Sequence, residues 1–296
     1  MKLFAPWQTI RHYLSHPLGR RDRVGTLRRM FRWQVGSRLL QQPCAMPFMG
    51  ETRLLVRRGM HGATGNVYVG LMEFEDMAFV LHFLRADDVF LDVGANVGVY
   101  SILAASRGAD VLAMEPVPST FEWLLDNVYF NRFNDRIVAR NIGVGRESGQ
   151  VRFTSDVGGA TNHVLTEADA IGNAVEVPVL PLDDLATEAA MLKIDVEGFE
   201  AEVIQGSKDL LATDALKAVL IELNGLGARY GFNDEDIHHQ MGGYGFVPMR
   251  YDPFTRALTR LSGRNKSGNT LYIRPSVSLE QRLRAAPAVT FGSATF

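Results

Sequence analysis

Acidic and amide side chains follow a series of short apolar segments in this 296-residue chain. The segments are rich in branched residues, which is typical of buried strands in a parallel sheet. The polar residues at their carboxyl ends are Asp92, Asn96, Glu115, Asn141, Asp195, Glu197, Glu222 and Asn224. An apolar sheet offers carboxylates no packing partner, so core packing does not explain them. Because open α/β sheets bind ligands beyond the carboxyl ends of their strands, these residues predict a ligand site at that edge.

The segment FLDVGANVGVYSILAA (90–105) is the most informative of these strand ends. An apolar strand stops near Asp92, glycines follow at Gly94 and Gly98, and a pattern with helical spacing begins after them. The glycines let the backbone approach a ligand closely, and a helix N-terminus beside them favours an anionic group. Glu115 follows about 20 residues after Gly94, where an acid binds ribose hydroxyls at the end of the second strand. A cofactor that contains a nucleoside is therefore expected.

The glycine spacing argues against a dinucleotide cofactor. The G-x-G-x-x-G pattern needs its second glycine so that the backbone can approach the pyrophosphate. This chain has Asn96 and Val99 at the second and third glycine positions. Asp92 repels phosphate as well, but it suits a cation, and S-adenosylmethionine (SAM) carries a sulfonium and an ammonium group and no phosphate. We predict that SAM is bound by Asp92, Gly94, Asn96, Gly98, Glu115 and Asn141.

Three segments, in this order and spacing, resemble the FkbM family of SAM-dependent methyltransferases: FLDVGANVGVYSILAA, AMEPVPSTFEWLLDNVYFN and LKIDVEGFEAEVIQG. The similarity covers roughly residues 66–225. It implies a class I methyltransferase fold, a Rossmann-like sheet of seven strands of which the last is antiparallel. It also implies methyl transfer to a hydroxyl, typically of a sugar, glycolipid, polysaccharide or polyketide. The matching residues are Asp92, Gly94, Asn96, Gly98 and Glu115 for the cofactor, and Asp195, Glu197 and Glu200 in the second motif.

Methyl transfer to a hydroxyl determines what the second motif has to do. SAM carries a good leaving group, so the enzyme chiefly aligns the hydroxyl and removes its proton. A sugar hydroxyl is a poor acid and needs a general base or a divalent metal. Asp195 and Glu197, at the end of the fourth strand, are the candidate catalytic bases. An alternative is an oxygen-rich site for Mg²⁺ formed by Asp195, Glu222 and Asn224.

Each of these acids also has a purely structural interpretation. Glu197 or Glu200 is placed to cap the helix that follows. Asp195 is placed to orient Lys193, which lies one strand step away on an otherwise apolar run. Lys193 in turn either pairs with an acid in the site or extends its ammonium group to solvent at the strand end.

Three histidines are further candidates. His238 or His239 is an alternative base, although one of two adjacent histidines on a helix usually packs against the core and the other faces solvent. His163 lies in a segment between the third and fourth strands, residues 151–180, that is longer than a crossover requires. That segment either lines the acceptor pocket or forms a solvated hairpin.

The elements that position these residues alternate along the chain. Apolar runs predict five strands, at residues 89–93, 111–114, 136–144, 191–195 and 218–223. Helical spacing predicts helices at residues 75–84, 98–106, 119–131 and 200–211, with Ser119 as an N-cap. The alternation indicates an α/β fold with a mostly parallel sheet.

Short strands are expected on both sides of this alternation. Residues 53–59 and 66–73 are predicted to form two strands around a Gly-rich turn. Residues 244–251 and 269–275, separated by a polar segment, predict an antiparallel C-terminal hairpin attached to the parallel sheet. We therefore expect a methyltransferase domain over residues 51–275, followed by a tail, residues 276–296, with a short helix and a loose end.

Residues 1–50 form a basic N-terminal extension. They contain nine Lys or Arg residues and one acid, Asp22, so the remainder of the chain has a net charge of −10. Aromatic residues are interleaved with the arginines. We expect amphipathic helices packed on the catalytic domain, with peripheral contact to an anionic membrane as an alternative. Nucleic acid is not an expected partner; the expected one is a small-molecule or glycan acceptor.

Composition limits the remaining classes. The single cysteine, Cys44, excludes an internal disulfide framework and a cysteine-based zinc site. No signal peptide or apolar span of about 18 residues is visible, so we expect a cytoplasmic enzyme or one peripheral to the inner membrane face. Two competing classes remain: a nucleotide-dependent oxidoreductase on a similar sheet, and a non-catalytic adaptor at a membrane surface.

Overall fold

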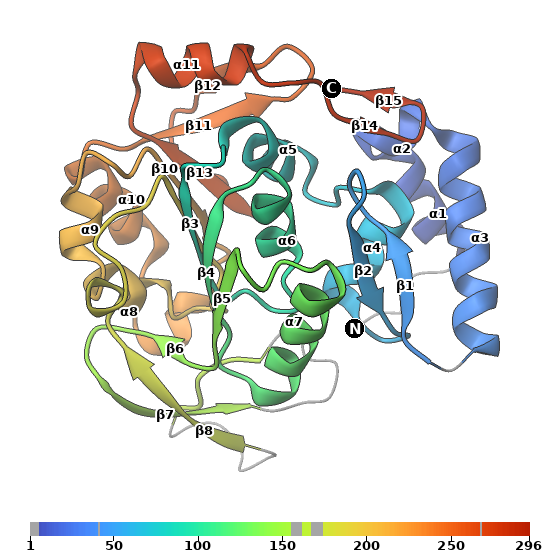
Figure 1. Cartoon of the computed structure of the whole chain (residues 1–296). Coiled ribbons are helices and arrows are strands. Elements are labelled where there is room, and N and C mark those ends of the chain that lie inside the picture. Colours follow the sequence, from blue (N-terminus) through green and yellow to red (C-terminus); the bar gives the residue numbers. More distant parts are fainter. Residues whose placement is uncertain (1–5, 41, 155–161, 167–173, 267) are drawn as a thin grey trace.

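An eight-stranded sheet lies at the centre of the fold, with the strand order β12-β11-β13-β10-β9-β3-β4-β5 (Figure 1). The computed structural model describes residues 6–40, 42–154, 162–166, 174–266 and 268–296. Five neighbouring strands are parallel: β3 (Val89–Val93), β4 (Asp110–Met114), β5 (Ile137–Arg140), β9 (Met191–Ile194) and β10 (Ala218–Glu222). Their carboxyl ends therefore meet at one edge, as predicted from the apolar runs.

Helices cover both faces of the sheet, which is why its strands are apolar on both sides. One face is covered by α5 (Phe74–Phe83), α6 (Val99–Ser106) and α7 (Pro118–Phe130), and the other by α8 (Glu200–Gln205), α9 (Lys208–Ala212) and α10 (Asp234–Gly243) (Figure 1). Successive residues of β3 point to opposite faces of the sheet. Phe90 therefore belongs to the core on the α5–α7 side, and Leu91 to the core on the α8–α10 side. Both side chains are fully buried.

The C-terminal hairpin expected from the sequence is confirmed, with one additional strand. The strand β13 (Asn269–Ile273) is antiparallel to β10, and β11 (Val247–Asp252) is antiparallel to β13. The additional strand, β12 (Ala257–Arg260), pairs with the free edge of β11. Its residues are mostly exposed, so the sequence shows no apolar pattern there.

The prediction of a strand over residues 66–73 is wrong. The chain forms the helix α4 (His61–Val69), which ends at Gly70 with φ +86°. Gly65 suggested a turn, but it lies inside the helix, where an added Cβ would approach Met72 Sδ to 2.8 Å. The glycine thus permits close packing. The upstream strand β2 (Arg53–Val56) pairs instead with β1 (Cys44–Pro47).

Three smaller expectations also fail. The N-cap of α7 is Val117 rather than Ser119, because Pro118 begins the helix. The crossover over residues 200–211 is two short helices, divided at Gly206, where an added Cβ would lie 2.0 Å from Gly145 O. The C-terminal tail is not loose: it forms α11 (Val277–Arg284) and a small hairpin, β14 (Thr290–Phe291) and β15 (Ala294–Thr295). It ends with a buried Phe296.

The segment inserted between the third and fourth parallel strands forms a separate sheet. Its strand order is β6-β8-β7, with β6 (Gly143–Val144), β7 (Gly149–Thr154) and β8 (Ala174–Leu180). His163 lies beside β7, where its carbonyl accepts a hydrogen bond from the Thr154 backbone N–H at 3.0 Å. Residues 155–161 and 167–173 of the inserted segment lie outside the described residues.

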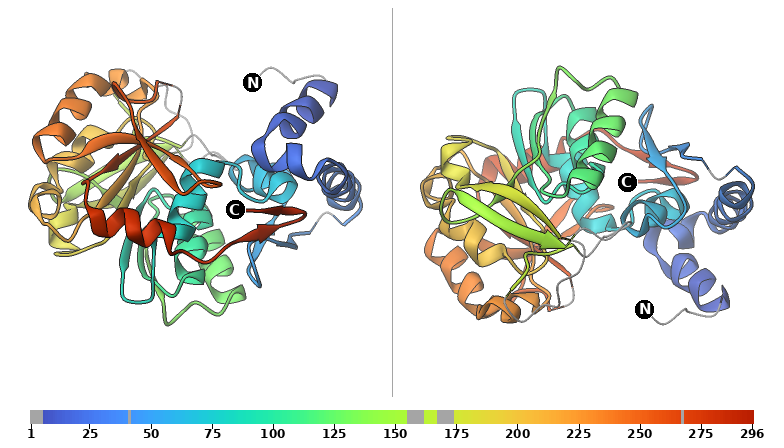
Figure 2. Two further views of the ribbon diagram at one scale, coloured as in Figure 1. Left: turned by 90° about the horizontal axis from the view of Figure 1, so that it is seen from above. Right: turned by 90° about the horizontal axis from the view of Figure 1, so that it is seen from below.

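The basic N-terminal region is helical, as expected. It forms α1 (Pro6–Ser15), α2 (Pro17–Arg21) and α3 (Arg23–Leu39), which lie at the opposite side of the molecule from α8–α10 in both views of Figure 2. Met30 and Trp33 of α3 are buried against the rest of the chain. Within the described ranges, no helix has both the length and the apolar character needed to cross a bilayer.

The buried histidine of α5 is expected to make the fold less stable in mild acid. His82 is 0 % exposed, and burial, assisted by the positive charges of Arg256, Arg107 and Arg85, lowers its pKa from 6.5 to about 3. Below pH 6.5 the unfolded chain therefore binds a proton that the folded chain does not bind, and stability falls as the pH falls. Between pH 6.5 and pH 5 the loss is about 2 kcal/mol.

Urea denaturation at pH 7 and pH 5 measures this loss. The variant His82→Gln removes the titrating group, so lowering the pH from 7 to 5 should destabilise it by about 2 kcal/mol less than the wild type, whatever the buried carboxyl groups contribute to both. His239→Gln is the matched control because His239 is exposed on α10. An unchanged pH dependence in His82→Gln would assign the acid sensitivity to other groups.

Candidate active site

The loop between β3 and α6 is held in an unusual backbone conformation. Gly94, Asn96 and Gly98 all have positive φ, at +76°, +51° and +86°. An added Cβ at Gly94 would lie 1.9 Å from Asp195 O, so only glycine permits the close approach of this loop to the end of β9. A positive φ is uncommon for a residue with a side chain, and such residues concentrate at functional sites.

Asp92 lies beneath this loop rather than in a pocket. It is 0 % exposed, and its Oδ2 accepts a hydrogen bond from Ser101 Oγ at 2.6 Å. Its other oxygen, Oδ1, lies 3.8 Å from Lys193 Nζ. The structure therefore places Asp92 where it supports the loop, while Gly94 and Asn96 line the adjacent pocket.

Glu115 connects the first loop to the next strand end. Its carboxylate accepts hydrogen bonds from the backbone N–H of Asn96 at 2.9 Å and of Val117 at 3.0 Å. Burial raises the pKa of Glu115 to about 7, while these two N–H groups oppose that shift. Asn141 does not line the pocket; its amide donates to the carbonyls of Glu115 and Pro116, at 2.9 Å each, and so positions the turn.

These strand ends enclose a narrow pocket. It is lined by Gly94, Asn96, Glu115, Pro116, Val117, Thr120, Phe153, Asn162, Asp195, Val196 and Glu197. Three carboxylates in this wall suit a cationic ligand, and the glycine at Gly94 leaves the loop backbone accessible. The pocket measures about 70 Å³, far below the roughly 300 Å³ of a typical ligand site. The pocket in this conformation is therefore smaller than a nucleoside needs.

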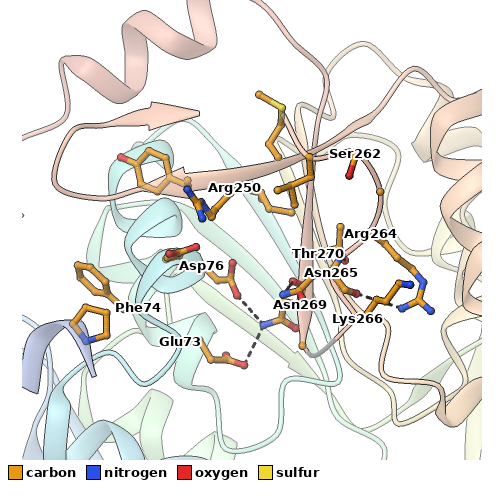
Figure 3. A pocket seen from close by; sticks show the side chains of 18 of the residues that line it. Glu73, Phe74, Asp76, Arg250, Ser262, Arg264, Asn265, Lys266, Asn269 and Thr270 are labelled. Atoms are coloured by element: carbon orange, nitrogen blue, oxygen red, sulfur yellow. Dashed lines mark hydrogen bonds between the residues drawn. The ribbon is translucent and has the colours of Figure 1, made fainter. Parts of the chain in front are cut away.

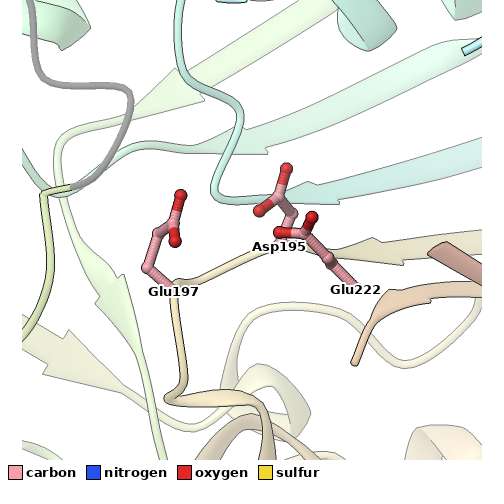
Figure 4. Close-up of side chains that lie close together, drawn as sticks. All are labelled: Asp195, Glu197 and Glu222. Atoms are coloured by element: carbon pink, nitrogen blue, oxygen red, sulfur yellow. The ribbon is translucent and has the colours of Figure 1, made fainter. Parts of the chain in front are cut away.

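Three carboxylates converge where β9 and β10 end (Figure 4). Oxygens of Asp195, Glu197 and Glu222 all lie within 4.8 Å of one another. Burial, together with the charge of Asp195, raises the pKa of Glu197 to about 7 and that of Glu222 to about 8. Glu197 has φ +53°, a second strained position at this edge. The three residues are called the carboxylate trio below.

Lys193 is the buried cation of the site. It is 4 % exposed, and its Nζ lies 3.1 Å from Asp195 Oδ2 and 3.8 Å from Asp92 Oδ1. Burial alone lowers the pKa of Lys193, but the surrounding carboxylates outweigh burial and raise it. Of the two interpretations of Lys193 open in the sequence, the structure shows the paired one: its ammonium group lies against Asp195.

The remaining candidates from the sequence lie outside the trio. Asn224 Oδ1 accepts from Leu226 N at 3.1 Å, so of the residues expected to hold Mg²⁺ only Asp195 and Glu222 are joined in the trio. Glu200 is buried and its Oε1 accepts from Gly198 N at 3.1 Å, so it holds the loop before α8 and does not cap that helix as considered from the sequence. His238, on α10, has its Nδ1 3.0 Å from the hydroxyl of Tyr272 in β13.

A large cavity of about 1010 Å³ opens beside the trio, between α5 and the C-terminal strands (Figure 3). Asn269 stands at its centre, and its amide donates to Glu73 Oε1 and to Asp76 Oδ2, at 3.1 Å each. Burial raises the pKa of Asp76 to about 8. In the β10–β13 pairing, Asn269 lies directly opposite Glu222. The carboxylate trio therefore lies between the narrow pocket and this cavity.

Comparison with known proteins identifies the chain. The profile of a family described as "Methyltransferase FkbM domain" matches residues 92–248, more than half of the sequence. The chain belongs to the FkbM methyltransferase family. The resemblance noted in the sequence is thus confirmed, and so is the class I methyltransferase fold, with its five parallel strands and an antiparallel strand inserted beside β10.

Relatives within and beyond the FkbM family are distant. The hexuronic acid methyltransferase AglP of Haloferax volcanii is 27% identical over 154 residues, 51% of this chain and 62% of AglP. The 31-O-demethyl-FK506 methyltransferase FkbM of Streptomyces tacrolimicus is 27% identical, covering 61% of this chain and 82% of that protein. The match thus spans less than two thirds of AglP. A crystal structure of methyltransferase FkbM from Methylobacillus flagellatus covers 72% of this chain and 55% of its own, with 14% identity and a TM-score of 0.44.

The FkbM-family chain has site residues that the sequence analysis did not select. Glu73 and Asp76 open the otherwise apolar helix α5, and Asn269 begins β13. The Tyr100 hydroxyl donates to Glu73 Oε2 at 2.7 Å, which connects this group to α6. The sequence contained one signal for the two acids. Acids in the first turn of an otherwise buried helix face either solvent or a site.

Proposed function

We propose that this chain is a SAM-dependent O-methyltransferase that acts on a hydroxyl of a sugar or another polyhydroxylated acceptor. The observation that carries the proposal is the position of the carboxylate trio between two cavities. Asp195 and Glu197 line the narrow pocket, proposed for SAM, and Glu222 lies opposite Asn269, which lines the large cavity proposed for the acceptor. Membership of the FkbM family favours a methyltransferase over the oxidoreductase alternative. The edge of the sheet also favours it, because it carries acids and lacks the glycine pattern that a dinucleotide needs.

The acceptor class follows from the groups that line the large cavity. Glu73, Asp76 and Asn269 present carboxyl and amide groups, which form hydrogen bonds with hydroxyls. The names of the two relatives above, a hexuronic acid methyltransferase and a methyltransferase for a 31-O-demethyl compound, support an acceptor oxygen. The volume of about 1010 Å³ accommodates more than a single sugar ring.

Asp195 is the proposed general base. It lines the SAM pocket and lies within 3.1 Å of Lys193, which fixes the orientation of its carboxylate. When SAM is bound, its sulfonium supplies the activated methyl group. Asp195 then accepts the proton of the acceptor hydroxyl as the oxygen forms its bond to the methyl carbon and the methyl–sulfur bond breaks. Glu197 and Glu222 lie beside Asp195, with oxygens of all three within 4.8 Å of one another.

Labelled SAM tests the proposal directly. Purified protein is incubated with methyl-labelled SAM and separate pools of neutral sugars, uronic acids and glycolipid extracts. Calorimetry with S-adenosylhomocysteine and with NAD gives a second measurement that needs no acceptor. Binding of S-adenosylhomocysteine without NAD binding, and label in a base-stable ether, support the proposal. Tight NAD binding without S-adenosylhomocysteine binding overturns it.

Chelation separates the base from the metal alternative. The trio contains oxygen ligands of the kind that Mg²⁺ prefers, but Lys193 already supplies a positive charge at Asp195. With Asp195 as the base, turnover should be unaffected by EDTA. Loss of turnover with EDTA that is restored by Mg²⁺ would instead assign the trio to a divalent cation.

Glu115→Gln is expected to lower the affinity for S-adenosylhomocysteine by about 10- to 100-fold, because the ribose hydroxyls lose hydrogen bonds to a charged acceptor. Calorimetry measures the affinity, and the thermal midpoint shows whether the variant is folded. Glu122→Gln, exposed on α7, is the matched control and should bind like the wild type. A folded Glu115→Gln variant with unchanged affinity would remove Glu115 from the cofactor site.

A further inference from the structure

The helix α3 has two apolar faces, of which only one is covered. Its inner face packs on the rest of the chain through Thr26, Met30, Trp33 and Ser37, at spacings of four, three and four residues. The opposite side of the helix carries Val24, Leu27, Phe31, Val35 and Leu39, at spacings of three and four residues. All five are exposed, Val24 by 80%, Phe31 by 69% and Leu39 by 76%. We call these five the outer face of α3.

Exposed apolar residues concentrate in this region. Among the described residues, eight of the fifteen exposed large apolar side chains lie between Trp7 and Leu40. A soluble surface ordinarily has such residues scattered singly, whereas a contiguous group indicates an interaction site. Figure 2 shows α1–α3 at the periphery of the molecule, so the outer face of α3 is open to a large partner.

Uncompensated positive charge lies within and beside the outer face of α3. Arg28, Arg32 and Arg38 are exposed on α3, next to the apolar residues in helical projection. The one acid in residues 1–50 is Asp22, and it is already paired with Arg29 at 2.8 Å. The rest of the chain has a net charge of −10, so an anionic surface attracts this region and repels the remainder.

A second feature lies where α1 approaches the start of α3. A hollow of about 500 Å³ is lined by Trp7, Ile10, Arg11, Leu14, Ser15, Arg20 and Arg23. Trp7 is 59% exposed there. Tryptophan beside arginines is the combination favoured at the boundary between lipid head groups and acyl chains.

We propose that the outer face of α3, with the adjoining hollow, docks on an anionic lipid bilayer. The apolar residues enter the acyl boundary, and the arginines between and beside them extend to the phosphates of the head groups. A nucleic acid would match the arginines but would leave the apolar outer face in contact with charged phosphates. A second copy of this chain would bring the same arginines against one another.

Docking would also affect access to the large cavity. This consequence rests on the proposed function, whereas the docking proposal does not depend on it. His16 and Pro17, at the junction of α1 and α2, line that cavity together with Glu73 and Asn269. The docking helices are thus part of its wall. A membrane-borne acceptor, such as a glycolipid, would reach the proposed acceptor cavity from the surface on which the chain is docked.

Sedimentation of the full chain with vesicles tests the docking. The vesicles consist of phosphatidylcholine alone or of phosphatidylcholine with phosphatidylglycerol added. Binding is expected for the anionic vesicles only, and added salt should weaken it. Combining Arg28→Glu, Arg32→Glu and Arg38→Glu should weaken it on the order of 100-fold or more. Phe31→Ser should weaken it about tenfold.

Matched variants keep the test specific. Arg152→Glu, Lys208→Glu and Arg260→Glu, combined in one chain, change the net charge equally at exposed positions elsewhere and should bind like the wild type. Val277→Ser, which is 74% exposed on α11, is the control for Phe31→Ser. Calorimetry with S-adenosylhomocysteine, unchanged in all variants, shows that the methyltransferase domain is intact.

Three outcomes overturn the docking proposal. Equal binding to both kinds of vesicle, or to none, removes the anionic bilayer as partner. Binding that both charge-reversed triple variants lose alike shows only an effect of net charge. Tight binding to a nucleic-acid duplex, or a dimer in solution that Phe31→Ser dissociates while vesicle binding is absent, assigns the outer face of α3 to those partners. None of these results bears on SAM turnover.

Discussion

Asp195→Asn should lower kcat by about 100- to 10,000-fold, the contribution ordinarily made by a general base. Asparagine has nearly the same shape, so it can still accept a hydrogen bond from Lys193, which now lies 3.1 Å from Asp195 Oδ2. It has no basic oxygen with which to remove the acceptor proton. Because other residues also line the proposed cofactor pocket, the affinity for S-adenosylhomocysteine should stay close to that of the wild type. Initial rates at saturating SAM and calorimetry measure the two effects separately.

Two comparisons make the Asp195→Asn result specific. Asp126→Asn, exposed on α7, should have wild-type kcat, since Asp126 lines neither pocket. Glu197→Gln should lose less rate than Asp195→Asn, because Asp195 and not Glu197 is oriented by Lys193. A larger loss in Glu197→Gln would make Glu197 the base. Full activity in both variants would show that the proton leaves by another route.

The strands that carry the site were predictable because they are buried on both faces. Runs such as Val89–Val93 and Met191–Ile194, apolar except for one charged residue each, indicate a covered sheet, and their order places their ends together. The FkbM motifs follow these same ends, so part of the narrow pocket was selected in advance, namely Gly94, Asn96, Glu115, Asp195 and Glu197. Local sequence was enough to predict these residues because each of them directly follows the end of one strand.

The large cavity was not predictable for the opposite reason. Glu73 and Asn269 are separated by 196 positions in the chain, and only the pairing of β13 with β10 brings them to the same edge. Residues 61–69 were also misassigned, because their glycines serve helix packing in α4 and resemble a turn in the sequence. Contacts of this kind depend on tertiary packing, which periodicity along the chain does not record.

The two roles of Asp92 show the same limit at a single residue. Its place in the first motif suggested contact with the cofactor, and charge alone supports that interpretation. The structure buries Asp92 completely under the β3–α6 loop, with Lys193 and Ser101 as its neighbours. The charge of Asp92 therefore acts mainly on the stability of the site. It influences the carboxylate trio only through Lys193.

Lys193→Met is accordingly expected to destabilise the fold by about 3–5 kcal/mol, the cost of leaving a buried charge without its partner. Asp92 is 0 % exposed and would lose the only cation within 4 Å of it among the described residues. Methionine matches the length of the lysine stem, so packing changes little. Urea denaturation at pH 7 measures the loss, and Lys208→Met, exposed on α9, is the matched control.

A double variant shows whether the loss comes from the orphaned charge. Asp92→Asn removes the charge that Lys193 neutralises, so Asp92→Asn combined with Lys193→Met should be less destabilised than the two single changes added together. Coupling of about 0.5–3 kcal/mol is the ordinary range for residues in contact. Additive losses would mean that Lys193 stabilises the fold through packing, or through Asp195 alone. In that case the Asp92–Lys193 pair would carry no part of the support for the β3–α6 loop, and the placement of Gly94 and Asn96 would rest on backbone geometry.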